Sequence, residues 1–217
     1  LILISVAYSS LYISFLQNER FKMLSILNSD PLNQTKNICY ITYPRTIALI
    51  YGNYAYPEII NNFIIKIKSN LDSKMEGYTN VKGGMTKFDY FLNDPDFINF
   101  TTYLINKYQV EYPTLFKNFP QRKIFSDAWG NEIKPGGSVN YHIHHTVQGI
   151  LYLTEGADLE LPELNIKISP KPGDYYIFPA QVIHGFDKHV GEQNRYSLIF
   201  NIKDYNSFNY ANLMYNR

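Results

Sequence analysis

Residues 136–148 read GGSVNYHIHHTVQ, and this stretch decides the fold that the sequence predicts. All five histidines of the chain lie between positions 142 and 189. Neutral imidazole is the commonest protein ligand for transition metals. His142 and His144 stand two residues apart, so on a strand their side chains share one face. His184, on a neighbouring strand, would complete a three-ligand site with open positions, an arrangement typical of catalytic metals.

The other two histidines are expected to have different roles. A lone strand histidine is usually a structural residue, whereas three within four positions need several partners or a metal. His145 would point away from His142 and His144 on an extended chain, so we leave it out of the predicted site. His189 stands near Asp187 and Glu192 in a pattern typical of a loop, where a structural role is expected.

The second half of the chain indicates a β fold. From about residue 120, short β-rich runs alternate with turn signals roughly every 8–12 residues, which is typical of a sandwich or barrel. Strands are predicted at 149–154, 165–169, 174–178 and 196–202. Pro172-Gly173 fits the two central positions of a type II turn.

Helices are predicted upstream of this β-rich half. Strands at 41–43 and 46–51 precede a helix that begins at Pro57, and a second helix begins at Pro95 with Asp94 as its N-cap. Residues 82–86, between the helices, are interpreted as a loop. The predicted apolar stripes are Ile60, Phe63, Ile64, Ile67 and Leu71 in the first helix, and Phe97, Phe100, Leu104 and Tyr108 in the second. We therefore predict an α+β, mainly β fold, a jelly roll with N-terminal helices packed on one sheet.

Composition excludes several functions. The chain has 217 residues and a formal net charge of +1, and it contains no basic run, so we expect no nucleic-acid partner. Cys39 is the single cysteine, which excludes an intramolecular disulfide and a cysteine-based zinc site. This fits a reducing compartment. We expect a cytoplasmic protein, in the host cytoplasm if the gene is viral.

The first 22 residues form an apolar segment to which the sequence assigns no role. Its largely apolar run of about 16 residues includes four serines and is shorter than the roughly 20 that span a bilayer, and it carries no basic n-region. We therefore expect no membrane role. Residues 23–217 are predicted to form a single domain, with helical support at about 57–110 and a jelly-roll core at about 120–203.

Two spacings resemble the motifs of the cupin superfamily. The first runs Gly136-x5-His142-x-His144-x3-Gln148, and the second runs Gly173-x5-Pro179-x4-His184. Gln148 stands where the first motif has Glu. The resemblance implies two strand–turn–strand units that bring three imidazoles to one mouth of a double-stranded β-helix.

The C-terminal segment narrows this resemblance. Arg195 lies eleven residues after His184, and Ser197 follows on the same face. This pattern resembles the Fe(II)/2-oxoglutarate oxygenases, and in particular the branch common in marine phages and bacteria. The matching segments are Asn80–Thr86, Trp129–Asn131, His142-x-His144, Gln148–Leu153, Phe178-Pro179 with His184, and Arg195–Asn201. Most of these oxygenases have Asp or Glu where this chain has His144, so the third ligand stays open, and His145 could enter the site if the alignment shifts by one position.

The oxygenase resemblance implies a set of cofactors and contacts. Fe(II) would bind His142, His144 and His184, with 2-oxoglutarate as co-substrate and O2 as oxidant. In that family the arginine pairs with the far carboxylate of 2-oxoglutarate, because a planar guanidinium matches a carboxylate fork. The substrate would be a small molecule or a peptidyl group. The residues implied for 2-oxoglutarate are Arg195, Ser197 and Tyr152, and those for the substrate are Trp129 and Asn131.

Simpler interpretations stay open for several of these residues. Arg195 could be an exposed strand arginine paired with Glu192, and Tyr152 and Trp129 could be core residues. At the level of the whole protein, the same motifs fit a three-histidine cupin metalloenzyme that does not use 2-oxoglutarate. They also fit a non-catalytic jelly-roll binding module, whose histidines hold a structural metal or none.

Overall fold

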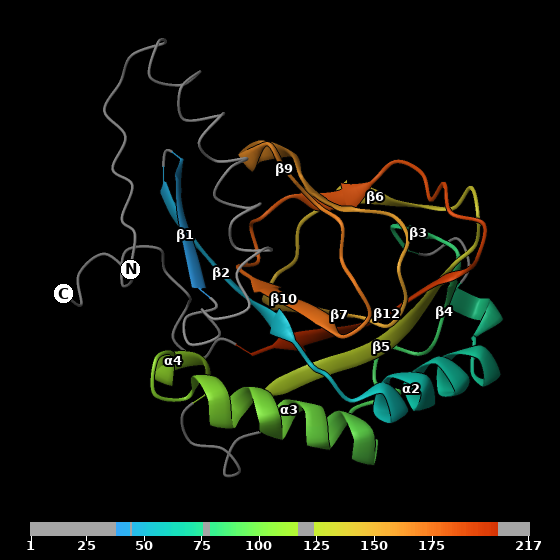
Figure 1. Ribbon diagram of the computed structural model, residues 1–217, viewed down its shortest axis with the longest axis horizontal. Helices are drawn as coiled ribbons and strands as arrows, with labels where there is room; N and C mark the ends of the chain where they lie inside the picture. Colours follow the sequence, from blue (N-terminus) through green and yellow to red (C-terminus); the bar gives the residue numbers. More distant parts are fainter. Residues whose placement is uncertain (1–37, 44, 76–78, 117–123, 204–217) are drawn as a thin grey trace.

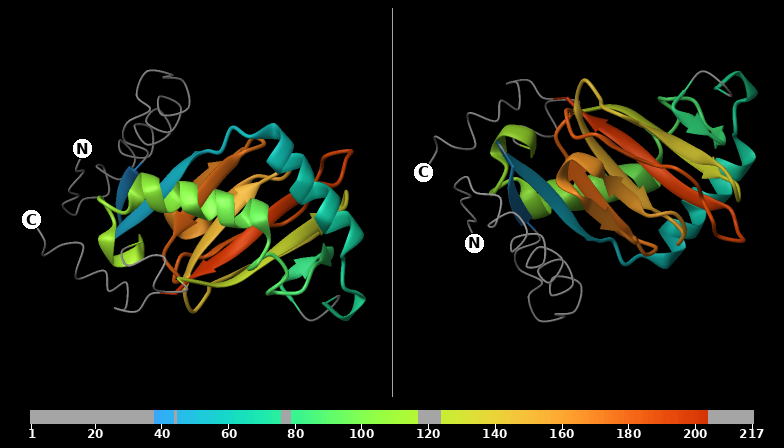
Figure 2. Two further views of the ribbon diagram at one scale, coloured as in Figure 1. Left: turned by 90° about the horizontal axis from the view of Figure 1, so that it is seen from below. Right: turned by 90° about the horizontal axis from the view of Figure 1, so that it is seen from above.

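Two antiparallel sheets face each other, and helices cover the outer face of the larger one (Figure 1). The computed structural model describes residues 38–43, 45–75, 79–116 and 124–203. The larger sheet has the order β1-β2-β10-β7-β12-β5-β4, and the smaller has the order β3-β6-β11-β8-β9. The predicted double-stranded β-helix with helices on one sheet is confirmed, and Figure 2 shows α3 lying across the larger sheet.

The elements have the following bounds. The larger sheet contains β1 (Ile38–Tyr43), β2 (Arg45–Asn53), β4 (Gly84–Met85), β5 (Phe125–Ile133), β7 (Val147–Tyr152), β10 (Asp174–Phe178) and β12 (Arg195–Ile202). The smaller contains β3 (Val81–Lys82), β6 (Ser138–His142), β8 (Leu159–Leu161), β9 (Ile166–Ile168) and β11 (His184–Phe186). The helices are α2 (Pro57–Ser69), α3 (Pro95–Tyr108) and α4 (Pro113–Phe116), with 3₁₀ turns η1 (Ser73–Met75) and η2 (Pro162–Leu164).

Helix α2 begins at Pro57 as predicted, and its buried residues are Ile60, Phe63 and Ile67. The prediction was wrong for Leu71, which lies beyond the end of the helix and is 37% exposed. The helix stops earlier because Asn70 forms its C-cap: the backbone N–H of Asn70 donates to the Ile67 carbonyl, and its side chain donates to the Lys66 carbonyl.

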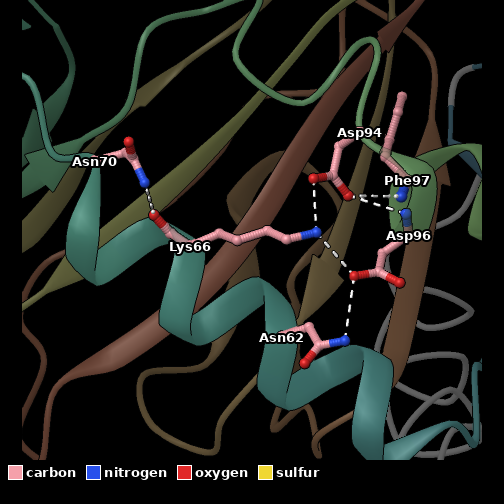
Figure 3. A network of polar contacts seen from close by, with 6 residues as sticks. All are labelled: Asn62, Lys66, Asn70, Asp94, Asp96 and Phe97. Atoms are coloured by element: carbon pink, nitrogen blue, oxygen red, sulfur yellow. Dashed lines mark hydrogen bonds and ion pairs between the residues drawn. The ribbon is translucent and has the colours of Figure 1, made fainter.

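Helix α3 starts at the predicted cap. One carboxylate oxygen of Asp94 accepts hydrogen bonds from the backbone N–H groups of Asp96 (3.0 Å) and Phe97 (3.3 Å). Its other oxygen lies 2.6 Å from Lys66 Nζ on α2, and Asp96 lies 2.8 Å from the same nitrogen (Figure 3). Lys66 therefore joins the last turn of α2 to the start of α3.

The helices approach the sheet closely where it carries glycine. A Cβ atom on Gly130 of β5 would lie 2.2 Å from Cγ1 of Ile67, so α2 seats directly on the strand backbone. The same face holds an aromatic and aliphatic core shared with α3, which includes Phe63, Phe97, Phe100, Leu104, Tyr175 and Phe200. The helices thus cover the outer face of the larger sheet, so a ligand site on this sheet has to lie on its inner face.

Two local predictions have different outcomes. The type II turn is confirmed, since Gly173 has φ +88° and Asp174 donates its backbone N–H to the Lys171 carbonyl. The loop predicted at 82–86 is wrong in part: β3 pairs with β6, and β4 pairs with β5, so this segment extends one edge of each sheet. Ladders of two residues are too short for a period-two pattern to reveal them.

The apolar segment 1–22 lies outside the described residues. Within the part of the chain that the structure describes, no helix is long and apolar enough to cross a membrane.

Candidate metal centre and its pocket

Three histidines come together between the sheets. His142 on β6 pairs directly with His184 on β11. His144 follows in the next loop, where its backbone N–H donates to the Ala180 carbonyl at 2.9 Å. One ring nitrogen from each histidine lies within 4.8 Å of the others, and among the described residues no carboxylate or cysteine joins this cluster. His145 is exposed and lies outside the cluster, as predicted.

Backbone carbonyls orient two of the rings. His142 Nδ1 lies 2.7 Å from the Asn140 carbonyl, and His184 Nδ1 lies 2.9 Å from the Val182 carbonyl. A carbonyl only accepts, so each Nδ1 carries the proton and each Nε2 keeps a lone pair for a metal. Nε2 of His142 and Nε2 of His144 lie 2.9 Å apart. Two cis ligands at about 2.1 Å from one ion would be roughly 3 Å apart, so the spacing suits a shared metal.

Burial keeps the cluster uncharged at neutral pH. It lowers the pKa of His142, lowers that of His144 to about 4 and lowers that of His184 to about 3. Neutral imidazole is the form that binds a metal, so no proton has to be displaced from these rings at pH 7.

Gln148 stands beside the third histidine. Its Nε2 lies 2.6 Å from Nε2 of His144, whereas its Oε1 has no hydrogen-bond partner among the described residues. Gln148 is 2% exposed and belongs to β7. An amide at the position where the cupin motif has Glu adds no charge to the cluster.

The cluster opens into a cavity of about 460 Å³ between the two sheets. Every residue that the sequence analysis assigned to metal, 2-oxoglutarate or substrate lines this cavity: His142, His144, His184, Arg195, Ser197, Tyr152, Trp129 and Asn131. The structure thus brings the whole predicted set to one place.

Arg195 lies buried in this cavity, with 4% of its surface exposed. Its Cζ is 4.8 Å from the ring centroid of Tyr152 and 4.7 Å from that of Phe186. No carboxylate among the described residues forms an ion pair with it, and its Nε has no hydrogen-bond partner there. The alternative interpretation, an exposed arginine paired with Glu192, is therefore wrong. A buried guanidinium that forms no ion pair within the described chain is suited to an anionic ligand.

Ser197, Tyr152 and Asn131 stand beside Arg195 in one row across three strands, since Ser197 pairs with Tyr152 on one side and with Asn131 on the other. Burial raises the pKa of Tyr152 to about 12 against the opposing effect of the Arg195 charge, so its hydroxyl stays protonated and can donate. The Oδ1 of Asn131 has no partner among the residues that the structure describes.

Trp129 is both a core residue and part of the cavity wall. It is 5% exposed and packs edge to face against Phe88 at 5.0 Å, but its Nε1–H meets no acceptor in the described part of the chain. A buried indole N–H usually has a partner, so this group is available to a ligand.

His189 is buried and has contacts that fit the structural role expected of it. It is 1% exposed, and its Nε2 lies 2.6 Å from the Gln193 carbonyl. Its backbone N–H and carbonyl bond to Gly137 and Gly136, so it fixes the turn that leads into β6.

Asp127 and Asn201 are among the cavity residues to which the sequence assigned no role. Asn201 Nδ2 donates to Asp127 Oδ2 at 3.2 Å. A signal for both was present, because Asn201 continues the alternation that starts at Arg195 and Ser197, and Asp127 continues the one through Trp129 and Asn131.

Solved structures of similar fold include two hydroxylases. One is the viral collagen prolyl hydroxylase of Paramecium bursaria Chlorella virus 1 in complex with 2-oxoglutarate (TM-score 0.52, 14% identity, covering 70% of this chain and 94% of that chain). The other is a Pseudomonas putida prolyl 4-hydroxylase (TM-score 0.51, 13% identity, covering 70% of this chain and 91% of that chain). No protein-family model and no curated protein matches the chain. At these identities the similarity establishes the shared fold.

Proposed function

We propose that this protein is an Fe(II)- and 2-oxoglutarate-dependent dioxygenase that hydroxylates its substrate. One observation carries the proposal: a buried guanidinium without a carboxylate partner among the described residues shares a cavity with an open cluster of three neutral imidazoles. The two prolyl hydroxylases of similar fold support the same reaction class. In this proposal residues 23–217 act as a single catalytic domain.

The residues present fit both groups. His142, His144 and His184 would hold Fe(II) through nitrogen ligands, a donor set that suits a divalent transition metal. Three protein ligands would leave positions for the co-substrate and O2. Bound iron would supply the O2 chemistry that no side chain can provide.

The chain's own groups would bind and orient 2-oxoglutarate. Arg195 would pair with its far carboxylate, held in place by the rings of Tyr152 and Phe186. Ser197 and the protonated Tyr152 would donate hydrogen bonds to the same carboxylate. Apolar residues between this row and the histidines, Ile150 and Ile199, would keep water from the reacting end.

The overall reaction balances without a further reductant. 2-Oxoglutarate loses CO2 and becomes succinate, which receives one oxygen atom of O2. The other oxygen atom converts a substrate C–H bond into C–OH. The protein's part is to place that C–H bond beside the metal and to exclude competing oxidations.

The direct test is an anaerobic titration of the Fe(II) protein with 2-oxoglutarate, followed by visible absorption and thermal stability. We expect a new visible band and a higher melting temperature, and succinate should form once O2 is admitted with a suitable substrate. Unchanged spectrum and stability would contradict the proposal.

Two alternatives predict different outcomes in the same titration. A three-histidine cupin metalloenzyme that does not use 2-oxoglutarate would bind the metal and ignore the acid. A non-catalytic jelly-roll binding module would show no turnover with either. The buried Arg195, which forms no ion pair with a described carboxylate, favours the oxygenase over both, because neither alternative needs an anion at that position.

A further inference from the structure

The inner face of the larger sheet carries three rows of side chains that line the cavity. Each row crosses β7, β12 and β5, and strand register defines its members. The rows are, in order along β12, Tyr152–Ser197–Asn131, Ile150–Ile199–Trp129 and Gln148–Asn201–Asp127. Two polar rows thus flank an apolar one, and the proposed function uses only the first polar row.

The second polar row offers acceptors that have no donor. Gln148 Oε1 and Asn201 Oδ1 have no hydrogen-bond partner among the described residues, and Gln148 is 2% exposed. Asp127 is the single carboxylate among the described residues that line the cavity. Within the described chain it forms no ion pair, and Asn201 donates to it at 3.2 Å. A row of acceptors that includes a carboxylate fits a ligand group that is cationic and rich in N–H donors.

This row also reaches the candidate metal centre. Gln148, at one end, lies 2.6 Å from His144 Nε2. Asp127 is two strands away, roughly 10 Å at the usual strand spacing. A cationic group held by Asp127 would therefore leave a carbon a few bonds away beside the metal.

The two charged ends of the cavity are well separated. Arg195 and Asn201 are six residues apart on β12, which is about 20 Å along an extended strand. An anionic co-substrate at Arg195 and a cationic group at Asp127 would not compete for one position. Phe88 and Ile143, which are 44% and 53% exposed, line the same cavity and offer apolar contact to the rest of the substrate.

We propose that Asp127, Asn201 and Gln148 form the specificity site for the primary substrate, which carries an ammonium or guanidinium group. This inference rests on the proposed function for its chemistry, but binding of the cation can be measured without turnover. The cationic group can belong to a free amino acid or to a side chain in a peptide, and the two sources are separate arms of the test.

The experiment uses matched pairs of cationic and neutral ligands. Arginine and lysine are compared with citrulline and norleucine within capped tripeptides, and each free amino acid is compared with its Nα-acetyl derivative, which lacks the α-ammonium group. Binding is measured by calorimetry on the metal-loaded protein with 2-oxoglutarate, and turnover is measured as hydroxylated product. We expect at least one cationic member to bind roughly tenfold to a hundredfold more tightly than its neutral partner, the range expected of a charge-assisted contact.

The variant Asp127→Asn, with Glu163→Gln as control, tests whether the preference for cationic ligands depends on Asp127. Glu163 is an exposed carboxylate on η2 outside the cavity. Asp127→Asn should abolish the preference for the cationic member and leave the 2-oxoglutarate titration unchanged, whereas Glu163→Gln should change neither. Equal binding of cationic and neutral ligands by the unsubstituted protein would overturn the inference, as would a preference that survives Asp127→Asn. A protein that binds the cation but fails the 2-oxoglutarate titration would instead contradict the proposed function.

Discussion

At the scale of single residues, the three histidines differ in what holds them. His142 and His184 each donate Nδ1–H to a backbone carbonyl, whereas His144 contacts the Gln148 amide instead. Two rings are therefore fixed by the main chain before any metal arrives. The third is positioned by a side chain that also belongs to the proposed substrate row.

Removal of a histidine of the cluster should weaken metal binding, whereas removal of the adjacent His145 should not. His184→Ala leaves two ligands, so we expect retention of Fe(II) after dialysis to fall by at least tenfold to a hundredfold, the effect that even outer-shell changes have on such sites. His145→Ala is the matched control, because His145 is exposed and outside the cluster. Metal content measured by mass spectrometry decides the matter, and equal loss in both variants would rule out the assigned cluster.

Arg195 should contribute to the binding of 2-oxoglutarate and not to the binding of iron. Arg195→Met keeps much of the packing against Tyr152 and Phe186 but removes the charge. Loss of one partner of a buried charge pair costs about 2–5 kcal/mol, so the Kd for 2-oxoglutarate should rise at least thirtyfold. Iron retention should match that of the unsubstituted protein, with Lys134→Met as a surface control. A parallel loss of iron would assign Arg195 a structural role.

At the scale of elements, the ion pairs between α2 and α3 predict a pH dependence. Burial by itself would lower the pKa of Lys66, but the hydrogen bonds to Asp94 and Asp96 outweigh it and raise the pKa. A raised pKa in the folded state means that the contribution to stability is complete below the unfolded value of about 10.4 and is lost as pH rises through the folded value.

Urea unfolding of the unsubstituted protein and of Lys66→Met measures this contribution. At pH 7 we expect a difference in unfolding free energy of about 1 kcal/mol, since the pair is partly exposed. The difference should shrink as the pH is raised above 10. A difference that stays constant from pH 7 to 11 would show that the aliphatic part of Lys66, and not its charge, stabilises the helices.

The contact between α2 and β5 gives a second prediction at this scale. Gly130→Ala would place a methyl group 2.2 Å from Ile67 Cγ1, so the helix or the strand must shift. Overpacking of this kind costs about 1–3 kcal/mol. Ile67→Ala removes the clashing atoms, so the double variant should be less destabilised than the sum of the two single ones. Strict additivity in a double-mutant cycle would contradict the close approach.

Some of the elements could be predicted from the sequence and others could not. Both long helices could be predicted, because Pro57 and the Asp94 cap start them and period-three-to-four stripes fill them. Leu71 was misplaced because an apolar stripe does not reveal where a cap ends the helix. The edge strands β3 and β4 were missed because their partners lie about fifty residues away, and two-residue ladders leave no local pattern.

At the scale of the whole molecule, the sequence predicted the residues of the candidate metal and co-substrate positions but not the second polar row of the same cavity. Spacing and resemblance predicted that the three histidines, Arg195 and Ser197 come together, since strand alternation places same-face residues two apart, and the structure has all five in one cavity. Alternation alone places Asp127 and Asn201 on the inner face, but that they form one row with Gln148 depends on which residues of β5, β7 and β12 stand opposite one another. That register exists only in the assembled sheet.

The two sheets carry different halves of the proposed site, so ligands should stabilise the molecule jointly. The smaller sheet supplies His142 and His184, and the larger supplies Arg195 and Ser197. A ligand at about 100 times its Kd adds about 2.7 kcal/mol to stability. We expect Ni(II), which cannot start turnover, to raise the melting temperature, and 2-oxoglutarate to raise it further only when the metal is present. EDTA should reverse both shifts.

In the variant Arg195→Met, the shift in melting temperature caused by the metal should persist, and the shift caused by 2-oxoglutarate should vanish. A shift caused by 2-oxoglutarate that is equally large without metal would refute a shared site between the sheets.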